Sequence, residues 1–361
     1  MLSDGRRLFF TFNHRSPSIQ WLLATLSCGT ALGLLLQKLQ VFEANRMQQQ
    51  LLFENFILMK TFFSAVVSGI FVCSILSMLP HTNQMLRATM AWYPLNFENR
   101  SYTSCALGGT LLGSGMALSG ACPTTLFVQL GSGVPNAVWV LAGGYCATVT
   151  FDILRPVISN CLFRRKCLVP FYLHRWMMTP YFNVSLPIAV MLATATFSLE
   201  LWKPKESHPV LVQELQPTPV AWSPYIVGIL ISLLHLSLIG IFYRFITNSD
   251  VFTIVNDSFL YLLKNRRLPS NIFPIFFNLG VTLGAYLSSF FSSQPAVWEI
   301  PSWYQSFFGG MSVFFGSKLA AGCSVGHGVS GMMALSKLSL FVIPFFWLGG
   351  FFMASFLTAT I

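Results

Sequence analysis

The chain carries very little charge. Only 9% of its 361 residues are Asp, Glu, Lys or Arg, whereas 54% are hydrophobic and the mean hydropathy is +0.64. Soluble domains carry roughly 25% charged residues, so the sequence lacks the polar surface that would enclose soluble domains of this length. This scarcity excludes a soluble protein. Since helices satisfy their own backbone hydrogen bonds in lipid, it predicts an all-α, polytopic membrane protein.

Sequence motifs for several common chemistries are also absent. The eight cysteines form no C-x-x-C pair, so neither a zinc site nor a dithiol redox pair is indicated. The chain contains no P-loop, which excludes ATP as a direct energy source. A metal carrier would be expected to cluster His, Met, Asp or Glu ligands, and no such cluster stands out. We therefore expect no bound metal and no cofactor.

The net charge of +10 is distributed in short basic runs between apolar segments. The runs contain Arg6, Arg7 and Arg15; Arg164, Arg165 and Lys166; and Lys264, Arg266 and Arg267. Such runs are typical of cytoplasm-facing loops beside anionic lipid headgroups, so they do not indicate binding to nucleic acid. Part of this charge would also draw an anionic substrate towards a pore mouth.

Seven apolar segments are long enough to span a membrane as helices. They cover residues 21–37, 56–79, 137–158, 184–201, 225–247, 273–292 and 338–361. Residues 81–100 are predicted to form a loop, and the pair Gly143-Gly144 is predicted to interrupt the third span. Short surface helices are expected within 38–50, 160–180 and 250–270.

Two glycine-rich stretches are apolar enough to lie at membrane depth but unsuited to ordinary spanning helices. The first reads GGTLLGSGMALSGAC and ends at Cys122; the second reads GGMSVFFGSKLAAGC and ends at Cys323. Each internal glycine lowers helix stability by roughly 1 kcal/mol relative to Ala, so breaks are expected near Gly120 and Gly322. Non-helical backbone at membrane depth is tolerated only where it is buried in protein or lines a cavity. A buried site is therefore predicted at the breaks.

The two stretches also resemble each other. Three glycines and one cysteine align without a gap at a spacing of 201 residues. Chance coincidence of glycines is the alternative, but four identities in register favour an internal duplication, as in many transporters. The predicted organisation is a polar segment over 1–18, a first repeat over 19–201, a linker over 202–224 and a second repeat over 225–361. Cys122 and Cys323 are then expected at similar membrane depth near a pseudo-two-fold axis.

Few side chains in the broken units can do chemistry. A thiol, with an ordinary pKa of about 8.5, is mostly protonated at pH 7 and can donate a weak S–H hydrogen bond to a soft anion; Cys122 and Cys323 are alternatively small packing residues. Lys318 is the only charged residue in either unit. It is a functional candidate by default, or it snorkels to an interface.

Two further features of the units concern the backbone. A second half-helix is expected to start at Pro123, and the free amides at such a start would form an anion site. His327 is interpreted as satisfying nearby backbone carbonyls in preference to contacting a substrate.

The sequence resembles the YeeE/YedE family of sulfur-compound transporters at both stretches. The matching residues are GMALSGACP over 115–123 and GCSVGHGVSG over 322–331, with a weaker likeness over 33–65. The resemblance implies a pseudo-symmetric, inverted repeat whose broken helices present Cys122 and Cys323 to thiosulfate or a related sulfur compound. Bacterial members that take up thiosulfate have a third cysteine after the first helix, whereas Val41-Phe42-Glu43 here contains none.

We therefore expect a transporter, not an enzyme, that takes up a sulfur-containing anion, most simply thiosulfate, along a central path lined by cysteine thiols. The expected substrate-binding residues are Cys122, Cys323, Lys318, His327, Gly120, Gly322, Pro123 and Gly326. One alternative is a membrane sulfurtransferase, in which His327 would be the only nearby base for a nucleophilic cysteine. The other is a carrier of a different soft anion, such as a selenium compound.

The expected location is the plasma (inner) membrane, as a multi-pass protein. The expected partners are the small anion, membrane lipid and a small sulfur-carrier protein at the inner face. No nucleic-acid partner is expected.

Overall fold

The protein is described here from a computed structural model. It describes residues 18–40, 42–93, 100–163, 171–202, 222–247, 251–256, 272–292 and 301–360. Within these residues, seven helices are long and apolar enough to cross a membrane. They are α2 (Ile19–Lys38), α4 (Ile57–Met78), α8 (Ala137–Leu162), α10 (Tyr181–Trp202), α11 (Pro224–Phe242), α13 (Phe273–Ser292) and α15 (Lys337–Thr360). The prediction of an all-α, multi-pass membrane protein is confirmed.

The prediction of a loop over residues 81–100 was wrong, because helix α5 (Pro80–Trp92) occupies most of it. Pro80 opens the helix at a position where a missing N–H costs nothing. The composition of this segment is polar on average, but the helix has a narrow buried face that includes Leu86 and Met90. Helix α5 packs on α4 and α11 with this face. A helix of this kind has too low a mean hydropathy to be recognised as a membrane segment.

Helix α8 runs without a break through Gly143-Gly144, so the predicted interruption was also wrong. A Cβ at Gly143 would collide with the carbonyl oxygen of Phe307. The glycine pair therefore allows two helix backbones to approach closely, which is the common role of small residues between membrane helices.

Two of the expected short helices form as α3 (Ala44–Leu51) and α9 (Leu173–Trp176). Residues 251–256 are also helical. The remainder of the expected segment, 257–270, and most of the predicted linker, 203–221, lie outside the described residues.

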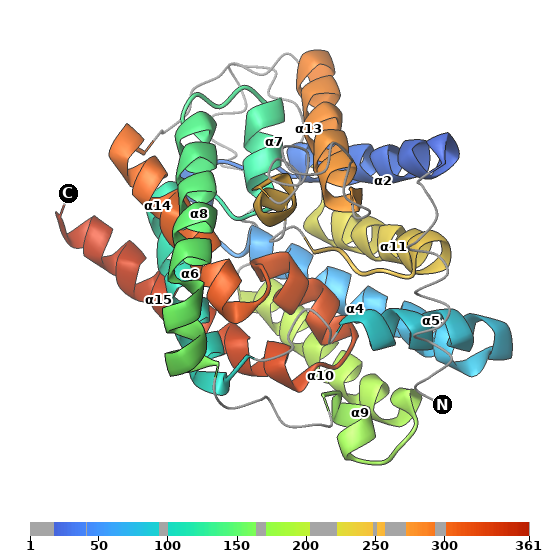
Figure 1. Cartoon of the computed structure of the whole chain (residues 1–361). Helices are drawn as coiled ribbons and strands as arrows, with labels where there is room; N and C mark the ends of the chain where they lie inside the picture. Colours follow the sequence, from blue (N-terminus) through green and yellow to red (C-terminus); the bar gives the residue numbers. More distant parts are fainter. Residues whose placement is uncertain are drawn as a thin grey trace.

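Helices α6 (Tyr102–Ser119) and α14 (Trp303–Ala320) form the centre of a four-helix group, with α8 against α14 and α15 against α6. Figure 1 shows these four helices together on one side of the molecule, with α2, α4 and α11 on the other. Glycines line the central contact. A Cβ at Gly108 would lie 2.7 Å from the oxygen of Gly316, and a Cβ at Gly316 would lie 2.7 Å from the oxygen of Gly108.

The contacts between α6 and α14 repeat themselves after exchange of the two helices. A Cβ at Gly115 would lie 2.5 Å from the nitrogen of Val313, and one at Gly316 would lie 2.5 Å from the nitrogen of Leu112. Gly108, early in α6, lies against Ala320 at the end of α14, and Gly309, early in α14, lies against Ser119 at the end of α6, so the helices run antiparallel. Reciprocal contact of equivalent residues is the pattern of a two-fold related interface.

The directions of the outer helices follow from contacts near their ends. Helices α2 and α13 are parallel, because the rings of Trp21 and Phe273 meet near their starts and Ser288 donates to Gln37 near their ends. Helix α11 runs the opposite way, since its last residue, Phe242, packs on Trp21.

Helices α4, α10 and α15 can be placed in the same way. Ser64, early in α4, donates to the carbonyl of Tyr225 at the start of α11. Ser74, late in α4, bonds to Ser185, early in α10. Helix α10 therefore starts at the end of the molecule where α4 finishes. The short helix α9 precedes α10, and the backbone N–H of Lys337, which opens α15, donates to the chain just ahead of α9.

The start of α6 and the end of α8 lie at the same end of the molecule as the starts of α10 and α15. Tyr102 opens α6 and packs on Phe341, early in α15. Ser101 donates to the carbonyl of Leu162, the last residue of α8. One end of the molecule, called the basic end below, thus comprises the starts of α2, α6, α10, α13 and α15 and the ends of α4, α8 and α11. The three basic runs lie outside the described residues; in the sequence they precede α2, follow α8 and precede α13, and the helix ends next to them in sequence all belong to this end.

Candidate functional site

Both glycine-rich helices break where the sequence predicts. Helix α6 ends at Ser119, and Gly120 adopts a left-handed conformation with φ 64°; the chain then turns into α7 (Thr125–Gly131). Helix α14 ends at Ala320, and Ala321 is left-handed with φ 59°. A π-helical turn over Gly326–Gly331 follows. The left-handed residue at each end redirects the chain, as is common at helix C-termini.

Each cysteine caps the helical segment that follows its break. The backbone N–H of Thr125 donates to Sγ of Cys122 at 3.2 Å, and the N–H of Gly326 donates to Sγ of Cys323 at 3.3 Å. The acceptor lies three residues before the donor in both copies, which is the geometry of an N-cap side chain. The Cys122 backbone N–H in turn donates to Oγ1 of Thr125 at 2.7 Å.

This capping changes the predicted chemistry of the breaks. Free amides were expected to form an anion site, but the cysteine sulfurs accept these amide hydrogens. The N–H of Leu126 and that of His327 are also used, donating to the carbonyls of Cys122 and Cys323. Pro123 directly follows the capping Cys122, as the first residue of the helical segment, and regular α7 begins two residues later at Thr125. The cap of Cys122 uses the sulfur as an acceptor, so the cap itself does not use the thiol hydrogen of Cys122.

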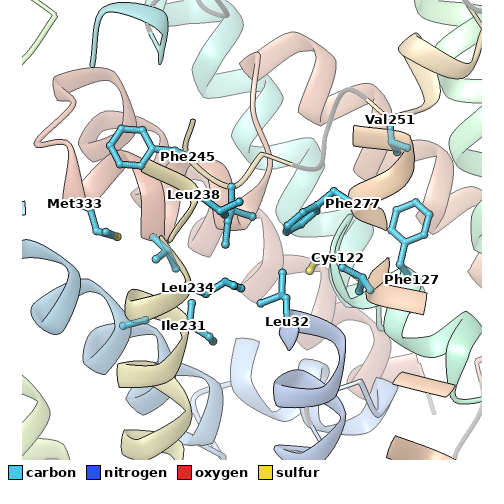
Figure 2. Packing of buried hydrophobic residues seen from close by; sticks show 14 of the residues in the cluster. Leu32, Cys122, Phe127, Ile231, Leu234, Leu238, Phe245, Val251, Phe277 and Met333 are labelled. Atoms are coloured by element: carbon cyan, nitrogen blue, oxygen red, sulfur yellow. The ribbon is translucent and has the colours of Figure 1, made fainter. Parts of the chain in front are cut away.

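A cavity of about 150 Å³ brings the two cysteines together. Its polar lining comprises Gln50, Cys122, Thr124, Thr125, Cys323, Ser324 and His327; the apolar lining comes from α2, α3, α4, α6, α15 and the stretch around the π-helical turn. About 10–15 Å³ of such volume suffices for one water, so the cavity has room for a small anion. Figure 2 shows Cys122 among buried apolar side chains that include Leu32, Phe127 and Phe277.

Five of the eight predicted site residues are absent from the lining of this cavity. They are Gly120, Pro123, Gly322, Gly326 and Lys318. A Cβ at Gly322 would lie 2.6 Å from Nε2 of His327, so this glycine makes room for the imidazole. Gly120 packs on Ala44 of α3, and the Gly326 carbonyl accepts a hydrogen bond from Tyr93 at 2.7 Å. In this arrangement these glycines shape the site.

His327 lines the cavity, but both of its ring nitrogens are engaged. Nε2 lies 3.1 Å from the carbonyl oxygen of Ala320, and Nδ1 lies 3.2 Å from Oγ of Ser339. Since a carbonyl only accepts, Nε2 carries a hydrogen. The imidazole therefore ties the end of α14 to the start of α15, in agreement with the interpretation that it satisfies a backbone carbonyl.

The cavity lies in the half of the molecule away from the basic end. Its wall includes Leu36, near the end of α2, and Leu58 and Met59, near the start of α4. The two breaks lie at different levels along the axes of α6 and α14. Helix α6 ends at Ser119, which lies beside Gly309, whereas α14 ends at Ala320, which lies beside Gly108. Eleven residues of helix separate these levels, which is about 16 Å at 1.5 Å per residue. These are the levels of the two helix ends and not of the sulfurs, so the expectation that Cys122 and Cys323 lie at similar depth stays a prediction.

Lys318 lies two residues before the end of α14 and is 8% exposed. It is one helical turn beyond Phe314, which packs on Gly144, so it faces α8. This location within the protein agrees better with a buried intramembrane cation than with snorkelling to an interface.

We expect Lys318→Met to reduce anion uptake strongly and Lys318→Arg to reduce it mildly, because the buried charge offsets that of an anion passing Cys323. Equilibrium binding of the anion in the cavity should change less than uptake, since Lys318 does not line the cavity. Binding and uptake measured on the same purified protein test this. Unchanged uptake by folded Lys318→Met protein would assign the residue a purely structural role.

Sequence reasoning missed Thr124, Thr125, Ser324 and Gln50 as cavity residues. The first three adjoin the two cysteines, so adjacency to the motifs could have indicated them. Gln50 comes from α3, far from either motif in sequence, and no signal in the chain points to it.

Comparison with known protein families shows the family of the chain. The sequence matches the family described as sulphur transport over residues 20–352, which includes both broken units and all seven spanning helices in whole or large part. Comparison with curated proteins finds no match. The chain belongs to the YeeE/YedE sulphur transport family.

Proposed function

We propose that the protein takes up thiosulfate, or a closely related sulfur-containing anion, by passing it between the thiols of Cys122 and Cys323. The observation that carries the proposal is that one cavity is lined by both thiols, one from each glycine-rich unit. Membership of a sulphur transport family supports a sulfur compound as the substrate class.

The chemistry of the thiols suits such an anion. Each sulfur accepts a backbone N–H, and we assign the donor role towards the anion to the S–H groups. A protonated thiol is neutral, so it does not repel an anion as a thiolate would. The polarisable sulfur of thiosulfate is a soft partner for an S–H group, and its release remains easy because an S–H hydrogen bond is weak.

The staggered breaks support passage across the membrane. Because the two helix ends are displaced by about 16 Å along the α6–α14 pair, an anion would meet Cys122 and Cys323 one after the other. The reciprocal contacts of α6 and α14 support an inverted repeat, in which equivalent units enter from opposite faces.

The orientation proposed for uptake follows from charge. In the sequence, the three basic runs are next to helix ends that all lie at one end of the helical bundle, and such runs are retained on the cytoplasmic side of membranes. We therefore assign the basic end to the cytoplasm. The cavity then lies in the outer half, where it would receive an anion from outside.

Uptake of radiolabelled thiosulfate into proteoliposomes tests the proposal. Unlabelled thiosulfate should compete, whereas sulfate should not, because sulfate has no soft sulfur to accept from the thiols. Selenite competition as strong as that of thiosulfate would favour a selenium compound as the substrate. Equal competition by sulfate, or no uptake above empty liposomes, would contradict the proposed function.

A further inference from the structure

Gln50 differs from the other polar residues of the cavity in having a buried group without a partner. It lies at the end of α3, is 3% exposed and lines the cavity together with Cys122 and Cys323. Its Nε2 has no hydrogen-bond partner. Among the described residues that line the cavity, no other buried side-chain nitrogen or oxygen is left unpaired in this way.

The orientation of the Gln50 carboxamide is determined by its surroundings. The backbone N–H of Met59 lies 3.0 Å from Oε1, and because an N–H only donates, the atom facing it is the carbonyl oxygen. The NH₂ group must then point away from Met59. Gln48 and Gln129 show the usual situation, since their Nε2 atoms donate to the carbonyls of Ala117 and Phe42 at 2.9 and 2.8 Å.

We propose that Gln50 is a substrate-binding residue whose unpaired NH₂ group donates to an oxyanion oxygen of the ligand in the cavity. An unpaired buried donor costs free energy in the empty protein, and a bound acceptor removes that cost. An amide NH₂ donates without accepting, so it suits the oxygens of an ionised anion, which only accept.

The remaining polar groups do not duplicate this role. Both ring nitrogens of His327 are engaged, and Oγ1 of Thr125 accepts from Cys122. The Ser324 hydroxyl can donate or accept and so does not select for an anion. The thiols suit a soft sulfur and the Gln50 amide suits a hard oxygen. The ligand class indicated is therefore an anion that carries both, a sulfur atom attached to an oxyanion group.

This inference rests on the proposed function. The variant Gln50→Glu tests the role of Gln50 separately from the question of whether the protein binds thiosulfate at all. The carboxylate can still accept from the Met59 N–H, so only the donor is replaced by an acceptor. We expect thiosulfate affinity to fall by at least about tenfold, since a hydrogen bond to a charged group is lost and a repulsion is added. The melting temperature of the empty protein should change little, but its rise on adding thiosulfate should be largely lost.

Binding is measured by calorimetry with sodium thiosulfate on purified wild-type, Gln50→Glu and Gln50→Leu proteins, with Gln48→Glu as the control on the same helix. If Gln50→Glu does not fold, the loss of affinity should appear in Gln50→Leu, which lacks the donor without adding charge. Wild-type affinity in a folded Gln50 variant, or an equal loss in Gln48→Glu, would overturn the assignment of Gln50 alone. Absence of thiosulfate binding by the wild type would instead contradict the proposed function.

Discussion

Cys122→Ala and Cys323→Ala are each expected to lower thiosulfate uptake by about 10- to 150-fold, the range that corresponds to one lost hydrogen bond to a charged group. Each change removes an S–H donor from the cavity wall. Because the two thiols belong to different broken units in the cavity wall, we expect that neither replaces the other. The measurement is the initial rate of radiolabelled uptake into proteoliposomes, normalised to the amount of folded protein.

Serine at either position separates transport from folding. The Ala variants also lose the cap on α7 or on the π-helical turn, which would cost about 0.5–2 kcal/mol of stability. Ser is a good N-cap and still donates a hydrogen bond, so Cys122→Ser and Cys323→Ser should keep the fold and part of the uptake.

Two other cysteines provide matched controls for the thiol experiment. Cys105 is buried on α6 and Cys146 is exposed on α8, and neither lines the cavity. Their Ala variants should transport at the wild-type rate. Wild-type uptake in both Cys122→Ala and Cys323→Ala would rule out the passage of substrate between these thiols.

The spanning helices and the two breaks were predictable because the physical signal is local. An apolar run of membrane length has one stable structure in lipid, and glycines beside a cysteine weaken a helix at a definite place. Helix α5 was missed because its apolar face is narrow and its average composition is polar. The meaning of Gly143-Gly144 was misjudged because the helix that it contacts, α14, is more than 150 residues away in sequence.

For the site, the sequence motifs predicted which two cysteines belong together, but not the contacts that the folded chain makes around them. The repeat spacing paired Cys122 with Cys323, but it carries no information on whether two helices run parallel or antiparallel, and hence none on depth. The role of each sulfur as a cap depends on the turn between the cysteine and the next N–H. The unpaired donor of Gln50 exists because Met59 uses the other end of the carboxamide, a contact that only the folded chain defines.

Gly115→Ala and Gly316→Ala are expected to destabilise the protein strongly and by equal amounts. The added Cβ would lie 2.5 Å from a backbone nitrogen and 2.7 Å from a backbone oxygen of the facing helix in both cases. Backbone atoms cannot move aside as a flexible side chain can, so α6 and α14 must separate. Overpacking of this kind costs about 1–3 kcal/mol or more per site. Thermal unfolding of the purified variants measures the loss.

Gly240→Ala on α11 is the control, because nothing lies within 4 Å of a Cβ at Gly240. It should be neutral or stabilising by up to about 1 kcal/mol, the usual gain in a helix.

The double variant Gly115→Ala/Gly316→Ala gives the sharper test of the two-fold contact. The two glycines lie on opposite helices of one interface, so the separation forced by the first Cβ also makes space for the second. The combined loss should therefore be smaller than the sum of the single losses, as for neighbouring sites that share a backbone shift. Unequal single losses would contradict equivalent packing of the two units. Strict additivity of the two losses would mean that each added Cβ is accommodated locally. The two helices would then not form the single rigid contact expected between the two units of an inverted repeat.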